Sequence, residues 1–91
     1  MNPEQREQAR HALGLDGRRK QSYRNRFVCP ESDPVWSAMV ANGWATMRPA
    51  ATVPFGGSAI FYLTLAGAQL ALDKGEKLDP EDFPPAKAGA A

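Results

Sequence analysis

The residues best suited to chemistry in this chain form a cluster of positive charges near its start. The cluster has no acidic neighbour within it and consists of Arg18, Arg19, Lys20, Arg24 and Arg26. Guanidinium and ammonium groups of this kind bind phosphate oxygens or the carboxylates of a partner. Phosphate contacts would give affinity without sequence preference and would weaken as salt rises. The alternative is a solvated face that pairs with the acidic segment 73–82 of the same chain.

His11 and Cys29 belong to the types that serve as catalysts and metal ligands, but neither has suitable companions. His11 lies in an alanine-rich segment with no second metal ligand nearby, which favours a surface or partly packed side chain. Cys29 closes an alternating apolar segment and is expected to be a small buried hydrophobe rather than a reactive thiol. A Cys–His pair would have no orienting third group, so we expect no catalysis, metal or cofactor.

Several large apolar side chains could also contact a partner. Phe55 lies near the tip of a long connection and is either tucked on the core or exposed as a contact anchor. Tyr23 and Trp36 are expected in the core rather than as stacking platforms. Leu78 and Phe83 interrupt an acidic tail, and we expect them to staple that tail onto the basic face. The same pair would also suit binding to a partner as an extended peptide.

Local signals indicate the elements that carry these residues. Asn2 as N-cap, Pro3, a capping box with Gln5 and a stop at Gly14 predict a helix over residues 3–13. From Ser22 the chain alternates, which predicts a strand ending before Pro30. Its inward residues would be Tyr23, Asn25, Phe27 and Cys29. Arg24 and Arg26 would then lie together on the outside.

The second half of the chain predicts helix, strand, long hairpin, strand and helix. Asp33 caps a helix that ends at Gly43, with an apolar face made of Val35, Trp36, Met39 and Val40. Residues 44–48 and 60–64 read as strands joined by the Pro- and Gly-rich connection 49–58. Thr64 caps a last helix that Gly75 stops. Its inward residues are predicted to be Leu65, Ala66, Ala68, Leu70 and Leu72. Gly67 costs helix propensity, and close packing on a neighbouring backbone would explain it.

This order, α-β-α-β-β-α, predicts an α+β fold with a three-stranded antiparallel sheet and helices on one face. Ninety-one residues make one small domain, which we place at residues 1–83, followed by a disordered tail at 84–91. One cysteine and the absence of any long apolar run predict a cytoplasmic protein without a signal peptide or membrane span.

Charge is balanced overall and unevenly distributed. Eleven basic residues face ten acidic ones, which argues against a general polyanion-binding protein. Residues 1–28 hold seven Lys and Arg against three acids, whereas residues 29–91 hold four against seven. Such asymmetry bears on steering and on the choice of partner rather than on the fold.

The stretch from Gly43-Trp44 to Phe61-Tyr62-Leu63-Thr64-x-x-Gly67 resembles the wing and last helix of bacterial winged-helix regulators of the multiple-antibiotic-resistance and phenolic-acid types. That resemblance implies two strands flanking a wing loop and a role in binding DNA or proteins. The chain departs from the pattern between Phe27 and Asp33, where there is no room for the helix that precedes a recognition helix. The helix over 33–42 also offers no Arg, Lys or Gln to base edges.

A second resemblance covers most of the chain. Residues 9–15, the Ser22-Tyr23-Arg24-Asn25 segment, the 63–68 segment and Leu78-Asp79-Pro80-Glu81-Asp82-Phe83 are similar to small uncharacterised proteins of tailed phages and prophages. This implies a viral origin and no known activity. The leading hypothesis is therefore a non-enzymatic phage accessory protein that binds a host or phage protein in the host cytoplasm. The alternative is a DNA-binding regulator that uses the wing and the basic arm on phosphates.

Overall fold

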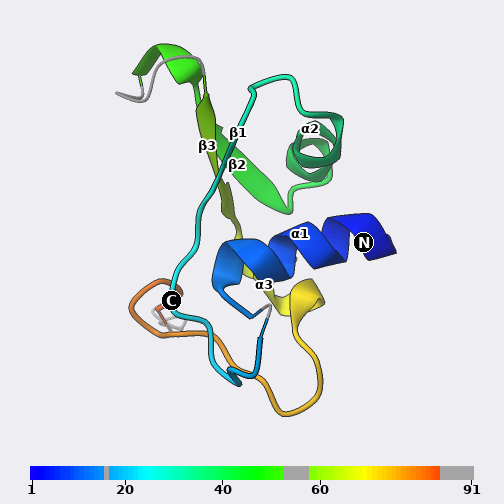
Figure 1. Cartoon of the computed structure of the whole chain (residues 1–91), viewed down its shortest axis with the longest axis vertical. Helices are drawn as coiled ribbons and strands as arrows, with labels where there is room; N and C mark the ends of the chain where they lie inside the picture. The colour runs from blue at the N-terminus through cyan, green and yellow to red at the C-terminus, as the bar shows by residue number, and fades with distance from the viewer. Residues whose placement is uncertain (16, 53–57, 85–91) are drawn as a thin grey trace, which may run out of the picture.

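The computed structural model describes residues 1–15, 17–52 and 58–84, and these form an α+β fold. The elements follow the order α1 (Pro3–Leu13), β1 (Phe27–Cys29), α2 (Pro34–Ala41), β2 (Ala45–Arg48), the 3₁₀ helix η1 (Ala50–Thr52), β3 (Ala59–Leu63) and α3 (Leu65–Ala71). The strands form an antiparallel sheet in the order β1-β3-β2. Figure 1 shows α2 beside the sheet, with α1 and α3 stacked at its lower end. The predicted class, element order and sheet are confirmed.

Helix α1 begins and ends where its sequence signals place it. The Asn2 side chain accepts from the Gln5 N–H at 2.8 Å, and the Gln5 side chain accepts from the Asn2 N–H at 2.9 Å. This reciprocal capping box satisfies two backbone donors that the helix leaves free. Gly14 ends the helix at φ 81°, a conformation that glycine adopts without a steric penalty. The inward face of α1 is fully buried at Ala9, Ala12 and Leu13.

The core lies between one face of the sheet and the helices. The strand register places Phe27 and Met47 on either side of Phe61. The Trp36 ring of α2 packs on Phe27 and Phe61, with centroids 5.2 and 5.5 Å apart. Trp36 is fully buried, as predicted, whereas Val40 is 38% exposed. The predicted apolar face of α2 was therefore too wide, because the sheet covers the Trp36 side of this helix and leaves Val40 at its margin.

The predicted strand from Tyr23 to Cys29 was too long. Strand β1 contains residues 27–29, because the backbone N–H groups of Tyr23 and Arg26 bond to the end of α1 instead of to β3. The Tyr23 N–H donates to the Leu13 carbonyl at 3.1 Å, and the Arg26 N–H donates to the Ala12 carbonyl at 3.2 Å. These carbonyls are left free at a helix end and compete with a β ladder for the same donors.

Helix α3 packs closely against the backbone at Trp44 through its small residues and not through its leucines. A Cβ added at Gly67 would lie 2.1 Å from the Trp44 carbonyl oxygen, which confirms the predicted close approach to a neighbouring backbone. Small residues must face that contact, and Gly67, Ala68 and Ala71 are the buried ones. Leu65 and Leu70 are consequently 43% and 47% exposed, so their predicted inward orientation was wrong.

Helix α3 is also shorter than predicted. It ends at Ala71 with Leu72 as its C-cap, and Gly75, at φ 86°, belongs to the turn that follows. The Asp73 and Glu76 side chains of that turn are engaged by α1, which draws the chain out of the helix. Ala66 is exposed, contrary to prediction, and Leu72 is half-buried.

No helix lies between β1 and α2 in the described residues 30–33, which form a turn closed by the Asp33 N–H and the Pro30 carbonyl at 3.0 Å. This agrees with the predicted lack of room there. Phe55 and, apart from Pro84, the predicted disordered tail 84–91 lie outside the described residues.

Candidate binding surface

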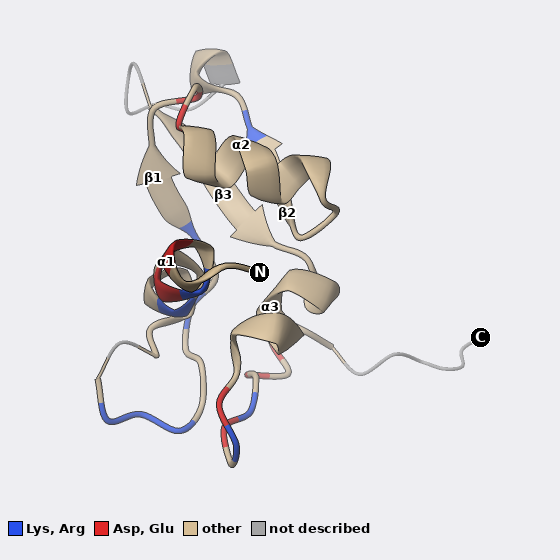
Figure 2. Cartoon of the chain, turned by 90° about the vertical axis from the view of Figure 1, so that its right-hand side faces the viewer, with Lys and Arg blue, Asp and Glu red and all other residues tan. Residues whose placement is uncertain are grey.

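The basic segment, residues 17–26, leaves the end of α1, loops outward and returns to the sheet as β1. Arg18, Arg19 and Lys20 are all exposed. Figure 2 shows this loop in blue, beside the mixed acidic and basic turn that follows α3. The predicted clustering of these three residues on the surface is confirmed.

Backbone pairing with the C-terminal segment holds the base of the loop. Gln21 and Lys77 form a parallel bridge, in which the Ser22 N–H donates to the Lys77 carbonyl at 3.0 Å. The Lys77 N–H in turn donates to the Lys20 carbonyl at 2.9 Å. The hydroxyl of Ser22, a fully buried side chain, accepts from the Asp79 N–H at 2.8 Å. The loop is therefore fixed by uncharged contacts, which leave its cations at the surface.

Tyr23 forms a platform for two of the arginines. Its ring is 48% exposed, and the guanidinium carbons of Arg19 and Arg24 lie 4.4 and 5.2 Å from its centroid. Cations at this distance over an aromatic face are attracted by the ring quadrupole. The prediction that Tyr23 belongs to the core was wrong. Gly14 explains the placement, because its missing side chain makes room for the edge of the ring.

Arg24 and Arg26 are not the equivalent outward pair that strand alternation predicted. Arg24 donates from Nε and Nη2 to the His11 carbonyl at 3.2 and 2.7 Å, and so caps the end of α1. Arg26 is exposed, and within the described residues its guanidinium has no hydrogen bond or ion pair. Arg24 thus has a structural duty, whereas Arg26 is available to a ligand.

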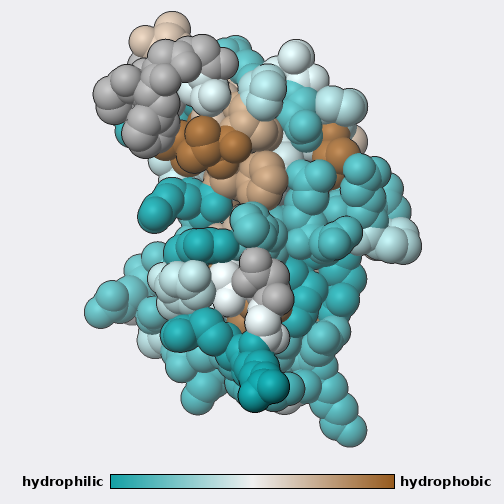
Figure 3. Space-filling view, viewed as in Figure 1, coloured by the Kyte–Doolittle hydropathy of each residue, from teal (hydrophilic) through white to brown (hydrophobic). Residues whose placement is uncertain are grey.

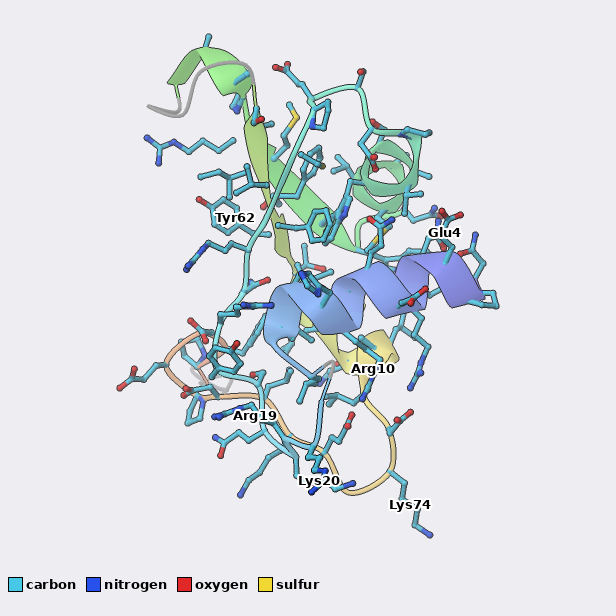
Figure 4. All side chains as sticks on the ribbon, in the orientation of Figure 1. Glu4, Arg10, Arg19, Lys20, Tyr62 and Lys74 are labelled. Carbon is cyan, nitrogen blue, oxygen red and sulfur yellow. The ribbon has the colours of Figure 1, made fainter. Side chains whose placement is uncertain are left out.

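Among the described residues, the ion pairs of the acidic segment are made with arginines of α1, and Lys20 of the basic segment has only a small electrostatic effect on Glu76. Asp73 pairs with Arg6, and Glu76 accepts two hydrogen bonds from Arg10 at 2.6 and 2.8 Å. Both arginines come from α1, whose i, i+4 spacing presents them side by side to the turn after α3. In Figure 4, Arg10 points from α1 toward that turn.

Arg10 and Glu76 form the most strongly perturbed charge pair of the structure. The Glu76 side chain is 4% exposed and that of Arg10 is 16% exposed. The hydrogen bonds from Arg10 outweigh the desolvation of the carboxylate and lower the pKa of Glu76 to about 2. Arg10 also donates to the Ala71 carbonyl at 2.9 Å and the Leu15 carbonyl at 3.0 Å. One guanidinium therefore ties α1, α3 and the C-terminal turn together.

Leu78 and Phe83 are half-buried against the core, which confirms that they staple the tail to the body of the protein. The surface on which they pack is not the predicted basic face. They line a depression with Leu65, Gln69 and Leu72 of the α3 region. Leu78 and Phe83 pack in the α3 region because it offers apolar side chains, whereas the basic loop offers few.

The roles of three polar side chains were missed in the sequence. Asn25 donates to the Leu63 carbonyl at 3.0 Å and accepts from the Leu63 N–H at 2.8 Å, so its amide continues the ladder beyond β1. The signal was its place in register, since counting back from Phe27 opposite Phe61 puts Asn25 opposite Leu63. Arg6 and Arg10 were also missed, although their i, i+4 spacing was visible.

His11 and Cys29 take up ordinary positions. His11 is exposed and lies edge-on to Phe27, with ring centroids 5.7 Å apart. Cys29 is half-buried rather than fully buried, and desolvation, with a smaller effect of Asp33, raises the pKa of its thiol to about 11. A thiol with this pKa is protonated at neutral pH and is a poor nucleophile.

The described part of the chain contains no group of three or more His, Cys, Asp or Glu side chains placed to hold a metal ion. Among the same residues, no helix is long and apolar enough to cross a membrane. Comparisons with protein-family models, with curated proteins and with solved structures found no match. The two resemblances therefore stay predictions, and the surface has to be interpreted from its own chemistry.

Proposed function

We propose that this protein is a non-enzymatic binding module whose basic segment contacts an acidic surface of a partner protein. One observation carries the proposal: the buried carboxylate of Glu76 and the exposed one of Asp73, both in the C-terminal turn, are engaged by Arg10 and Arg6. Within the described residues Arg18 and Arg26 have no ion pair, and Lys20 has only a small electrostatic interaction with Glu76. Their charge therefore stays available for a ligand, on a loop whose base is fixed by backbone pairing.

The stacking at Tyr23 supports recognition of carboxylates. Stacking and capping hold Arg19 and Arg24 in defined orientations before any partner arrives. A preorganised guanidinium loses less side-chain entropy when it forms a bidentate contact than a freely rotating one does. If the predicted resemblance to small phage proteins holds, the partner is a host or phage protein.

DNA binding is the second candidate, and the exposed arginines favour it as far as phosphate contacts go. Base reading is poorly supported, because α2 buries Trp36 and Met39 and exposes Ser37, Val40 and Ala41. None of these three side chains makes the bidentate contacts that read base edges. Five cations would give a slope of roughly −4 to −5 for log affinity against log salt on duplex DNA, without sequence preference.

The test is capture of a partner from host lysate, with and without nuclease treatment, by the wild-type chain and two variants. Arg18→Gln/Arg19→Gln/Lys20→Gln removes charge from the basic segment. Lys74→Gln removes an exposed charge from the turn after α3 and is the control. We expect capture that survives nuclease, is lost in the triple variant and persists in Lys74→Gln. Loss of the partner on nuclease treatment, or sequence-selective duplex binding at about 150 mM salt, would contradict the proposal.

A further inference from the structure

The structure fixes which backbone N–H and carbonyl groups of β1 point toward β3 and which point to the open outer edge of the sheet. In an antiparallel ladder, the backbone groups of successive residues point alternately to the two sides of a strand. The Leu63 N–H and carbonyl point toward the β1 side, because they bond to the side chain of Asn25. By alternation Phe61 and Ala59 do the same, and their register partners are Phe27 and Cys29. The N–H and carbonyl of Val28 consequently point away from the sheet.

Val28 is the open position on this edge. Within the described residues, neither its N–H nor its carbonyl has a hydrogen-bond partner outside the ladder. On one side the Arg26 N–H is taken by the Ala12 carbonyl, and on the other Pro30 has no N–H. The Val28 side chain is itself 45% exposed. The edge therefore offers one donor and one acceptor in a defined place.

The surface around Val28 is hollowed, and two arginines line the depression that includes it. A depression of about 220 Å³ is lined by His11, Arg24, Arg26, Phe27 and Val28. A neighbouring one of about 310 Å³ is lined by Glu7, Gln8, His11 and Phe27. Figure 3 shows that the apolar surface on this face of the molecule gathers over the sheet.

We propose that an extended acidic segment of a partner protein adds to β1 as a fourth strand. This rests on the proposed function and names its mode of recognition. The Val28 N–H donates to a carbonyl of the added strand, and the Val28 carbonyl accepts from its N–H. Side chains of a strand alternate between two faces, so carboxylates on one face of the added strand meet Arg26, while apolar side chains on its other face lie against Phe27.

Charge selects this occupant over a second copy of the chain. β1 is three residues long, so pairing two β1 edges would gather the arginines of both copies along one short joint. Like charges across neighbouring strands are destabilising, whereas carboxylates opposite Arg26 are stabilising. A nucleic acid could use the same arginines but has no peptide groups to pair with Val28.

The test uses a labelled peptide of alternating glutamate and valine residues as the probe and compares two substitutions at one position. Val28→Pro removes the outward N–H without removing a bond to β3, and proline is tolerated at strand edges of this kind. Val28→Thr keeps both the N–H and the β-branched shape, and is the matched control. We expect Val28→Pro to weaken binding about tenfold and Val28→Thr to leave it unchanged. Arg26→Gln should weaken binding several-fold, and Lys74→Gln should not.

A peptide N-methylated at alternate residues gives the same test without changing the protein. If circular dichroism shows that Val28→Pro disturbs the fold, binding of the methylated peptide to the wild-type protein is measured in place of that variant. Equal binding of the methylated and unmethylated peptides would overturn strand addition, and a Val28-dependent dimer in sedimentation would overturn the choice of occupant. The choice of occupant would also be overturned if duplex DNA displaced the peptide and if Val28→Pro and Val28→Thr weakened peptide binding equally. Loss of lysate capture together with intact, Val28-dependent peptide binding would refute the proposed function alone.

Discussion

Two groups of arginines in this small protein differ in whether the fold brings an acidic partner to them. Arg6 and Arg10 on α1 are committed to carboxylates and carbonyls of the segment after α3. Arg18 and Arg26 in the basic segment face solvent, without ion pairs among the described residues. The residue type is the same, and the difference is whether the fold brings an acid within reach. A count of charges along the chain does not reveal which arginines the fold leaves without an acidic partner.

The largest expected effect is on the committed group. Arg10→Met keeps the apolar stem but leaves the Glu76 carboxylate, 4% exposed, without its counter-charge. Removing one partner of a buried ion pair costs about 3–5 kcal/mol, and we expect a loss of unfolding free energy in that range in urea denaturation. Arg18→Met is the matched control and should change stability by less than about 0.5 kcal/mol. Equal effects of the two substitutions would remove the distinction between the groups.

The second prediction concerns pH. The folded-state pKa of Glu76 is about 2, well below the ordinary value of a glutamate in an unfolded chain, about 4.3. Its stabilising contribution is therefore fully present above about pH 4.3 and is lost as the pH falls toward 2. Glu76→Gln should be about 2–3 kcal/mol less stable than the wild type at pH 7, and the two should converge near pH 2. A stability difference that does not depend on pH would show that the ion pair is not its source.

A smaller effect is expected at the apolar staple. Phe83→Ala removes part of a half-buried ring packed against the core and should lower the unfolding free energy by about 1–2 kcal/mol. Glu81→Gln changes an exposed neighbour and serves as the control. Unchanged melting of Phe83→Ala would mean that the ion pairs alone hold the C-terminal segment, which would sharpen the contrast between the two arginine groups.

The smallest effect on stability belongs to the exposed group. Arg18→Gln/Arg19→Gln/Lys20→Gln should shift the unfolding free energy by no more than about 0.5 kcal/mol per site. On duplex DNA the same variant should flatten the slope of log affinity against log salt by roughly 3, because each lost phosphate contact contributes about 0.9. A large loss of stability would contradict this prediction and would show that these residues stabilise the fold as Arg10 does.

The candidate site was only partly predictable. The exposure of Arg18, Arg19 and Lys20 followed from a polar run with no apolar position to bury, and that of Arg26 from strand alternation. Arg24 was misplaced, because its orientation depends on the end of α1 rather than on strand alternation. Phe55 lies outside the described residues, so its role as a contact anchor stays a prediction.

The sequence by itself determined the elements whose signals are local. The capping box of Asn2 and Gln5, the cap at Asp33 and the cap at Thr64 each bond within three residues, so local chemistry placed those helix starts. Gly14 and Gly43 marked helix exits for the same reason, since both adopt positive φ. With two apolar strands between them, these signals were enough to predict the α+β class.

Tertiary structure decided the rest, because the competing partners lie far apart in the chain. The length of β1 depended on carbonyls at the end of α1, and the buried face of α3 depended on the Trp44 carbonyl. The choice of ion pairs joined residues more than sixty positions apart, as between Arg10 and Glu76. Long charged side chains pair with whichever opposite charge the fold brings near, and composition does not specify that neighbour. Which arginines pair with acids and which are left without an ion pair among the described residues was therefore settled only by the packing of α1 against the segment that follows α3.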